Sequence, residues 1–161
     1  MRCLNLYCIN LKERIRVDQD IEELRQKYLN QDFDEKIFEI KPEQTIEYAR
    51  LCGETAERFL NPDHEDFQAP PTYIASLSGR RSMPVDFPRL GIGMDAGKGV
   101  ECFKPIRPGE PLTGRTHLHD IYTKTGRSGR MIFTVSRIEF FDAEGTHLAN
   151  ADSRAVMREK S

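Results

Sequence analysis

The chain has 161 residues and a formal net charge of −2 at neutral pH. This length suits one domain with a substantial core, and the slightly acidic balance argues against a general nucleic-acid binder, whose surface would be basic. No apolar run approaches the roughly 20 residues that cross a bilayer, and the first eleven residues are too short and too soon charged for a signal peptide. We therefore expect a cytoplasmic protein that binds neither nucleic acid nor membrane.

The four cysteines are Cys3, Cys8, Cys52 and Cys102. They form no CxxC pair and match no zinc-ligand spacing. We expect reduced, mostly buried thiols, with no metal site and no cofactor. A Cys3–Cys8 disulfide is the alternative, although it would be unusual in the cytosol.

The first predicted element is an amphipathic helix over residues 12–30. Its apolar stripe consists of Ile15, Ile21, Leu24 and Tyr28, and charged residues cover the remaining faces. Such a stripe packs either on its own domain or on a partner chain, and the sequence leaves both alternatives open.

A short strand is predicted at residues 36–40 and a short helix at residues 42–53, with Gly53 as its cap. A polar loop, residues 54–68, comes next.

The segment 70–79 predicts a sparsely charged helix. Two prolines suit its first turn, because the first helical residues need no N–H partner. Tyr73, Ile74 and Leu77 fall on one face, and Gly79 ends the helix.

Glycines and prolines punctuate residues 82–99, where we expect a flexible surface loop. The glycines at 91, 93, 97 and 99 have a spacing that could suggest a phosphate loop. That alternative lacks a GK[ST] sequence and a preceding strand.

Four strands are predicted at residues 100–106, 112–124, 131–141 and 146–157, as an antiparallel meander. One face of the last strand carries mostly small side chains, which leaves room for a helix laid across the sheet. These residues are His147, Ala149, Ala151, Ser153, Ala155 and Met157. The sequence thus predicts an α+β fold in which an antiparallel sheet wraps around one central helix, the 70–79 segment.

Three motifs, in this order, resemble those of the MaoC-like dehydratases, and more closely their N-terminal-type, often non-catalytic half. They are Tyr48-Ala49-x-x-x-Gly53-Glu54, Ala69-Pro70-Pro71-Thr72, and the sequence FKPIRPGE at residues 103–110. The resemblance implies a hot-dog domain over residues 36–161, preceded by an N-terminal helical extension, residues 1–35. It also implies an assembly of two hot dogs that binds an acyl-CoA or acyl-carrier-protein thioester. The reaction would be reversible hydration of a trans-2-enoyl thioester to the (R)-3-hydroxyacyl thioester.

Active members of that family take their catalytic acid and base from a G-D-x-N-P-x-H motif, which aligns with residues 53–59. Glu54 stands at the aspartate position, and Phe59, which carries no proton, stands at the histidine position. An insertion would instead bring Asn61-Pro62-Asp63-His64 into the site and make His64 the partner of Glu54. The alternative is that His64 is a solvated loop histidine.

The resemblance also places the N–H that stabilises the enolate oxygen at the start of the central helix. Pro70 and Pro71 have no N–H, so Thr72 and Tyr73 are the first possible donors. The glycine-rich segment and the apolar helix face are candidate walls of an acyl tunnel, and Asp95 is a candidate carboxylate. The candidate cations for the phosphates of coenzyme A are Arg80, Arg81, Lys98, Lys104 and Arg107.

His117 and His119 point to one face of a strand and precede Asp120. A His-x-His pair can hold a metal, but no third ligand is identified, so we expect a solvent-facing polar pair.

Phe59 at the motif's histidine position and the two prolines at the start of the central helix depart from the pattern of active family members. They predict that this chain is the non-catalytic, substrate-tunnel chain of an (R)-specific enoyl-thioester hydratase, or 3-hydroxyacyl-thioester dehydratase. The chain would form a homodimer, or a heterodimer with a catalytic MaoC-like chain. The alternatives are a self-sufficient homodimeric enoyl-CoA hydratase that uses His64, and a non-enzymatic acyl-CoA-binding module. The sequence leaves open the acyl-chain length and type, the carrier, the pathway and the identity of the partner.

Overall fold

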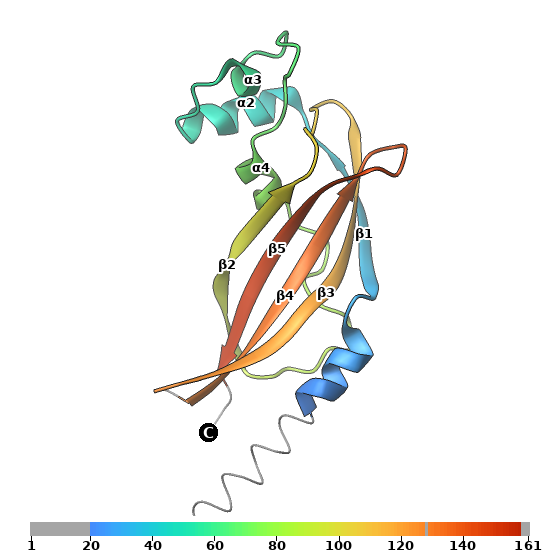
Figure 1. The fold of residues 1–161 in the computed structure, drawn as a ribbon, viewed down its shortest axis with the longest axis vertical. Coiled ribbons are helices and arrows are strands. Elements are labelled where there is room, and N and C mark those ends of the chain that lie inside the picture. Colours follow the sequence, from blue (N-terminus) through green and yellow to red (C-terminus); the bar gives the residue numbers. More distant parts are fainter. Residues whose placement is uncertain (1–19, 128, 159–161) are drawn as a thin grey trace, which may run out of the picture.

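The structure is a computed structural model that describes residues 20–127 and 129–158 (Figure 1). Residues 20–28 are helical. The elements that follow are β1 (Asp32–Glu39), α2 (Pro42–Leu51), α3 (Glu57–Leu60), α4 (Pro71–Ser76), β2 (Ile92–Cys102), β3 (Pro111–Gly126), β4 (Gly129–Phe141) and β5 (His147–Arg158). Within the described ranges, no helix combines the length and apolarity needed to cross a membrane.

The five strands form one antiparallel sheet in the order β1-β3-β4-β5-β2. The strands β3, β4 and β5 are successive hairpins, as the sequence predicts. The strand before them does not join β3. It crosses to the far edge and pairs with β5, so the predicted four-strand meander is correct for its last three strands only.

Residues 92–99 belong to β2, so the expectation of a flexible loop there is wrong. The strand runs in register from Ile92 opposite Arg158 to Cys102 opposite Ala149. Its backbone pairing with β5 outweighs the low strand preference of glycine, which depends strongly on context. A β-bulge interrupts the register after Asp95, and Gly97 takes a φ of +101° there.

The predicted end of this strand is also wrong, because the chain leaves the sheet after Cys102. The N–H groups of Phe103 and Lys104 both donate to the carbonyl oxygen of Leu148, at 2.8 and 3.2 Å. These two bonds hold the turn that leads to β3.

The central helix α4 is shorter than predicted and ends at Ser76 instead of Gly79. The backbone is already extended at Leu77. The N–H groups of Arg80 and Arg81 donate to the Asp34 carboxylate of β1, which draws this part of the chain away from the helix axis.

The main hydrophobic core lies between α4 and the sheet. Ile74 is fully buried in a cluster with Phe140 of β4 and with Ala149 and Ala151 of β5. The small-residue face of β5 therefore does receive the central helix, as the sequence predicts. Because α4 has only six residues, we conclude that it covers one end of that face.

The N-terminal helix packs on its own domain, which decides between the two alternatives for residues 20–28. Ile21 and Tyr28 are buried in a second core cluster with Leu118, Ile121 and Ile132 of the sheet. The Arg25 guanidinium also contacts the Asp120 carboxylate, with 2.9 Å between Nη1 and Oδ1. The rest of the predicted helix, including Ile15, lies outside the described residues.

Cys52 and Cys102 are free thiols and both are exposed, so the expectation of burial is wrong for them. Cys52 follows the end of α2, and Cys102 ends an edge strand. Neither position is covered by another element. Cys3 and Cys8 lie outside the described residues.

Candidate functional site

The residues proposed for catalysis gather at one end of the sheet. The α2–α3 segment, which carries Glu54 and Phe59 and is followed by the loop with His64, lies at the top in Figure 1, beyond the end of β2 and the start of β5. Local hydrogen bonds or packing hold each of these residues in place.

Glu54 follows a glycine cap, as the sequence predicts. Gly53 has a φ of +77°, a conformation that favours glycine, and its N–H donates to the carbonyl of Arg50 at 3.1 Å. The N–H of Glu54 donates to the carbonyl of Ala49 at 2.9 Å. The backbone of Glu54 is thus part of the helix terminus, and its side chain is partly exposed.

His64 lies in the loop after α3 and bonds within its own turn. Its Nδ1 accepts the N–H of Asp66 at 3.0 Å, and the Asn61 side chain accepts the N–H of Asp63 at the same distance. An Nδ1 that accepts a hydrogen bond carries no proton, so only Nε2 is left for acid–base chemistry. Phe59, at the motif's histidine position, is buried, with the Arg58 guanidinium 4.9 Å from its ring centroid.

The start of α4 offers few free amides. Pro70 and Pro71 have no N–H, and the N–H of Tyr73 donates to the carbonyl of Pro70 at 2.9 Å. Within this first turn, Thr72 alone keeps an amide outside the helical bonding. Burial raises the pKa of the Tyr73 phenol, whose ring meets Tyr48 edge-on at 5.3 Å between centroids.

The predicted cations are exposed and dispersed. Lys98 Nζ contacts the carbonyl of Ala75 at 3.2 Å, and Arg107 Nη1 contacts that of Glu65 at 3.2 Å. Arg80 follows α4, and Lys104 lies in the turn after β2. Asp95 accepts the N–H of Gly97 at 2.7 Å within the β-bulge. The proposed roles of these residues in substrate binding stay predictions, and so do the proposed catalytic roles of Glu54 and His64.

The histidine pair does not face solvent as expected, because His117 is 6% exposed. Its ring centroid lies 5.8 Å from that of His119. Burial lowers the pKa of His117, and His119 and Arg137 act in the same direction, whereas Glu139 and Asp32 oppose them. Among the described residues, no group of three or more potential ligands could hold a metal ion.

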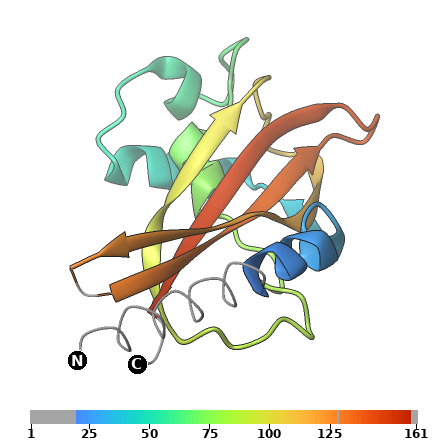
Figure 2. The same cartoon turned by 60° about the horizontal axis from the view of Figure 1, so that its bottom comes forward.

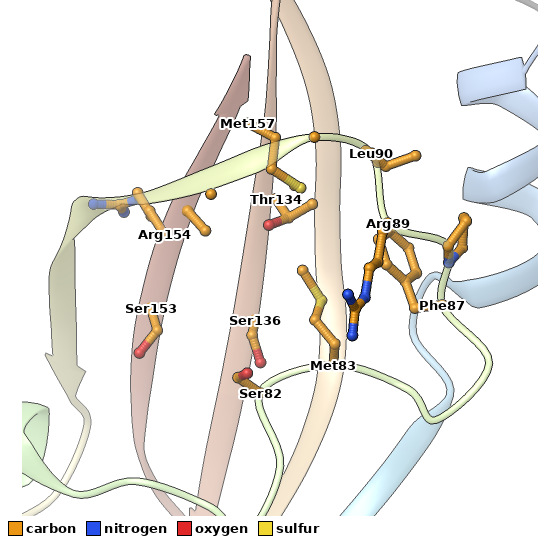
Figure 3. Close-up of a pocket in the computed structure, with 14 residues that line it drawn as sticks. Ser82, Met83, Phe87, Arg89, Leu90, Thr134, Ser136, Ser153, Arg154 and Met157 are labelled. Atoms are coloured by element: carbon orange, nitrogen blue, oxygen red, sulfur yellow. The ribbon is translucent and has the colours of Figure 1, made fainter. Parts of the chain in front are cut away.

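A cavity of about 530 Å³ lies at the opposite end of the sheet. We call it the sheet cavity. One wall is the inner face of β4 and β5, and the other is the loop between α4 and β2 (Figure 3). This loop runs along the lower side of the sheet in Figure 2. The lining residues are Ser82, Met83, Phe87, Pro88, Arg89, Leu90, Gly91, Gly93, Thr134, Ser136, Ser153, Arg154, Ala155 and Met157.

The sheet cavity exists because α4 is short. Ala149 and Ala151 lie in the core beneath the helix, whereas Ser153, Ala155 and Met157, farther along the same face, line the cavity. Its size falls within the roughly 300–1,000 Å³ of small-molecule sites. The sequence indicated the space through the small side chains of β5, but it assigned the whole of that space to the helix.

The loop wall is mainly apolar: Met83, Phe87 and Leu90 line the cavity (Figure 3), and the same side chains also pack against the second core cluster. The Phe87 ring is held by an edge-on contact with Tyr28, at 5.2 Å between centroids. These three residues fall within the segment expected to be irregular, and their apolar character was the available signal. The glycine-rich segment contributes Gly91 and Gly93 to the lining, whereas none of the individually proposed site residues contributes.

Comparisons with known proteins identify the family. Residues 29–151 match the family model described as "FAS1-like, dehydratase domain region". No curated protein matches the chain. A MaoC-like dehydratase from Phytophthora capsici is 23% identical with a TM-score of 0.61, over 84% of this chain and 49% of that one. The chain therefore spans about half the length of that relative.

Two similar structures are two-component complexes from Mycobacterium tuberculosis. The ChsH1–ChsH2 complex is 16% identical with a TM-score of 0.65, over 89% of this chain and 94% of that one. The C-terminally truncated HadBC (3R-hydroxyacyl-ACP dehydratase) complex is 20% identical with a TM-score of 0.58, over 80% and 99%. These likenesses show the fold, and together with the family model they establish that this chain is a hot-dog protein of the MaoC-like dehydratase family.

Proposed function

We propose that this chain is the substrate-binding, non-catalytic subunit of an (R)-specific enoyl-thioester hydratase, and that the sheet cavity holds the acyl tail. The observation that carries this proposal is the space that the six-residue α4 leaves open over β5. An apolar lining in a space of this size suits an acyl group bound through a thioester.

The incomplete catalytic machinery supports a role in binding. Hydration of an enoyl thioester needs a base for water, an acid for C2 and a donor for the enolate oxygen. Phe59 has no ionisable group, and the first turn of α4 keeps one free amide. His64 would have to act through Nε2, because its Nδ1 accepts the N–H of Asp66. We therefore assign the chemistry to a partner chain of the same fold, bound to a CoA or acyl-carrier-protein thioester.

The free edge of β2 is the proposed partner site. Within residues 20–127 and 129–158, β2 pairs with β5 on one side and with no strand on the other. Ile92 and Met94 on this strand are 68% and 56% exposed, which is unusual for large apolar side chains on an unprotected edge. A partner strand bound here would cover both side chains and lie next to Gly91 and Gly93 of the cavity wall.

The test is reconstitution from the native cell extract. The tagged chain is used to capture its partner, and crotonyl-CoA hydration is measured on the eluate. Met94→Lys places a charge on the β2 edge and should abolish both capture and activity. Ile37→Lys is the matched control, because Ile37 is 65% exposed on β1, at the other edge of the sheet.

Activity in the eluate that survives Met94→Lys would refute the proposed edge. An eluate that contains no second MaoC-like chain, although the pure chain hydrates crotonyl-CoA, would refute the division of labour. It would favour a self-sufficient homodimer that uses Glu54 and His64. A chain that binds acyl-CoA but shows no hydratase activity, either alone or with any captured chain, would be a non-enzymatic acyl-CoA-binding module.

A further inference from the structure

We propose that the acyl group held in the sheet cavity is oxygenated, carrying hydroxyl or keto groups where it lies against β4 and β5. This inference rests on the proposed function, because it names the class of acyl group that the cavity accepts. It depends on the polar groups of the cavity wall and not on the size of the space.

Two residues of this wall, Thr134 and Ser136, carry hydroxyl groups that bond to no other described group of the protein. Thr134 is 1% exposed and Ser136 is 7% exposed, and both line the cavity. Among the described residues, neither hydroxyl has a hydrogen-bond partner, and no unpartnered polar side-chain atom is sealed from solvent, so both hydroxyl oxygens are open to the cavity. Ser153 lies opposite Ser136 in the β4–β5 register, so the hydroxyls form a patch across two strands (Figure 3).

The patch begins where the core ends. On the same face of β4, Ile138 and Phe140 belong to the core cluster under α4. The next two residues on that face, Ser136 and Thr134, carry hydroxyl groups and line the cavity. A wall built only for alkyl chains would continue the apolar row. The change from apolar to hydroxyl residues therefore coincides with the space left for a ligand.

A saturated alkyl chain is a poor match for this wall. In the free protein the hydroxyls can bond to water in the cavity. An alkyl chain displaces that water and returns no hydrogen bond, so the buried hydroxyls are left unsatisfied. An oxygen on the chain restores the bond, and sites of this kind discriminate strongly against analogues that lack the polar group.

The charges of the lining narrow the class further. The charged side chains among the lining residues are Arg89, on the loop wall, and Arg154, whose guanidinium also contacts the Asp152 carboxylate at 3.6 Å, and the lining contains no carboxylate (Figure 3). An electron-rich oxygen is compatible with this field, whereas an amino group is not.

The experiment compares acyl thioesters of one length. Dodecanoyl-CoA and a set of its mid-chain hydroxy and keto analogues are titrated calorimetrically into the full chain in its assembly. The best oxygenated analogue should bind at least about tenfold more tightly than dodecanoyl-CoA. Ser136→Ala and Thr134→Val should weaken that analogue while leaving dodecanoyl-CoA binding unchanged or tighter. Thr113→Val, on β3 and outside the cavity lining, is the matched control.

Two results would overturn the inference while leaving the proposed function intact. One is dodecanoyl-CoA binding as tightly as every oxygenated analogue. The other is a preference for oxygen that survives the Ser136→Ala, Thr134→Val double variant. If no thioester binds at all, the proposed function itself fails, and this inference fails with it.

Discussion

Filling the sheet cavity with Ala155→Phe should remove long-chain acyl binding while sparing the fold. Ala155 is on the inner face of β5 and lines the cavity, so the new ring enters space that an acyl tail would occupy. If the ring displaces roughly four methylene groups, each worth about 0.8 kcal/mol when buried, binding weakens by about 3 kcal/mol. At about 1.4 kcal/mol for each factor of ten, this is a loss of roughly 150-fold.

The assay is calorimetric titration of dodecanoyl-CoA and butyryl-CoA into the assembled protein. The longer thioester should lose most of its affinity, and the shorter one should lose little because it fills less of the cavity. Val156→Phe is the matched control, since Val156 lies on the opposite face of the same strand. Equal dodecanoyl-CoA affinity in the Ala155→Phe variant and the wild-type chain would refute the placement of the acyl tail.

Three further predictions concern the fold that supports the cavity. Ile74→Ala should destabilise the protein by about 3–4 kcal/mol, because this fully buried side chain packs on alanines that cannot fill the gap. Denaturant unfolding measures this change. The control Leu51→Ala, at an 82% exposed position, should change the stability little. Gly114→Ala should cost about 1–3 kcal/mol, because its Cβ would lie 2.6 Å from Phe38 Cε2 and 3.0 Å from Ile138 Cγ2; unchanged stability would mean that this part of the core is looser than described. The lowered pKa of His117 means that the unfolded chain binds more protons at this residue, so its contribution to stability is complete above pH about 6.5 and declines as the pH falls toward the folded-state pKa. His117→Asn should flatten that part of the stability profile, and an unchanged pH slope would exclude His117 as its source.

The sheet and the helical stripes were predictable because their side chains repeat with clear periods. Leu112 to Phe141 alternate along two hairpin strands, and the stripe that contains Ile21 and Tyr28 matches the observed second core. These patterns depend only on burial of one face of each element. They predict well whether a segment is a helix or a strand, and less well which other elements it packs or pairs with.

The edge strand β2 was missed because its stability comes from β5 and not from its own residues. Four of the nine residues 91–99 are glycines, and local propensity therefore indicates a loop. The β5 backbone supplies the missing partners along almost the whole segment. A tertiary contact of this kind leaves little trace in the strand's own sequence.

The sheet cavity was only partly predictable for a similar reason. The small residues of β5 indicated a space, but α4 ends at Ser76, and the chain beyond it is held at Arg80 and Arg81 by Asp34, which is distant in sequence. Without that helix end, the sequence offered no reason to separate Ser153 and Ala155 from Ala149 and Ala151. The hydroxyl patch on β4 became apparent only when its strand was placed beside β5.

The most direct test of the account is the crotonyl-CoA hydration rate of the pure recombinant chain, measured with and without its captured partner. We expect no turnover by the pure chain beyond that of its own His64→Ala variant, and activity once the partner is added. Robust turnover by the pure chain that His64→Ala abolishes would contradict it, and would make His64 the catalytic residue of a complete enzyme.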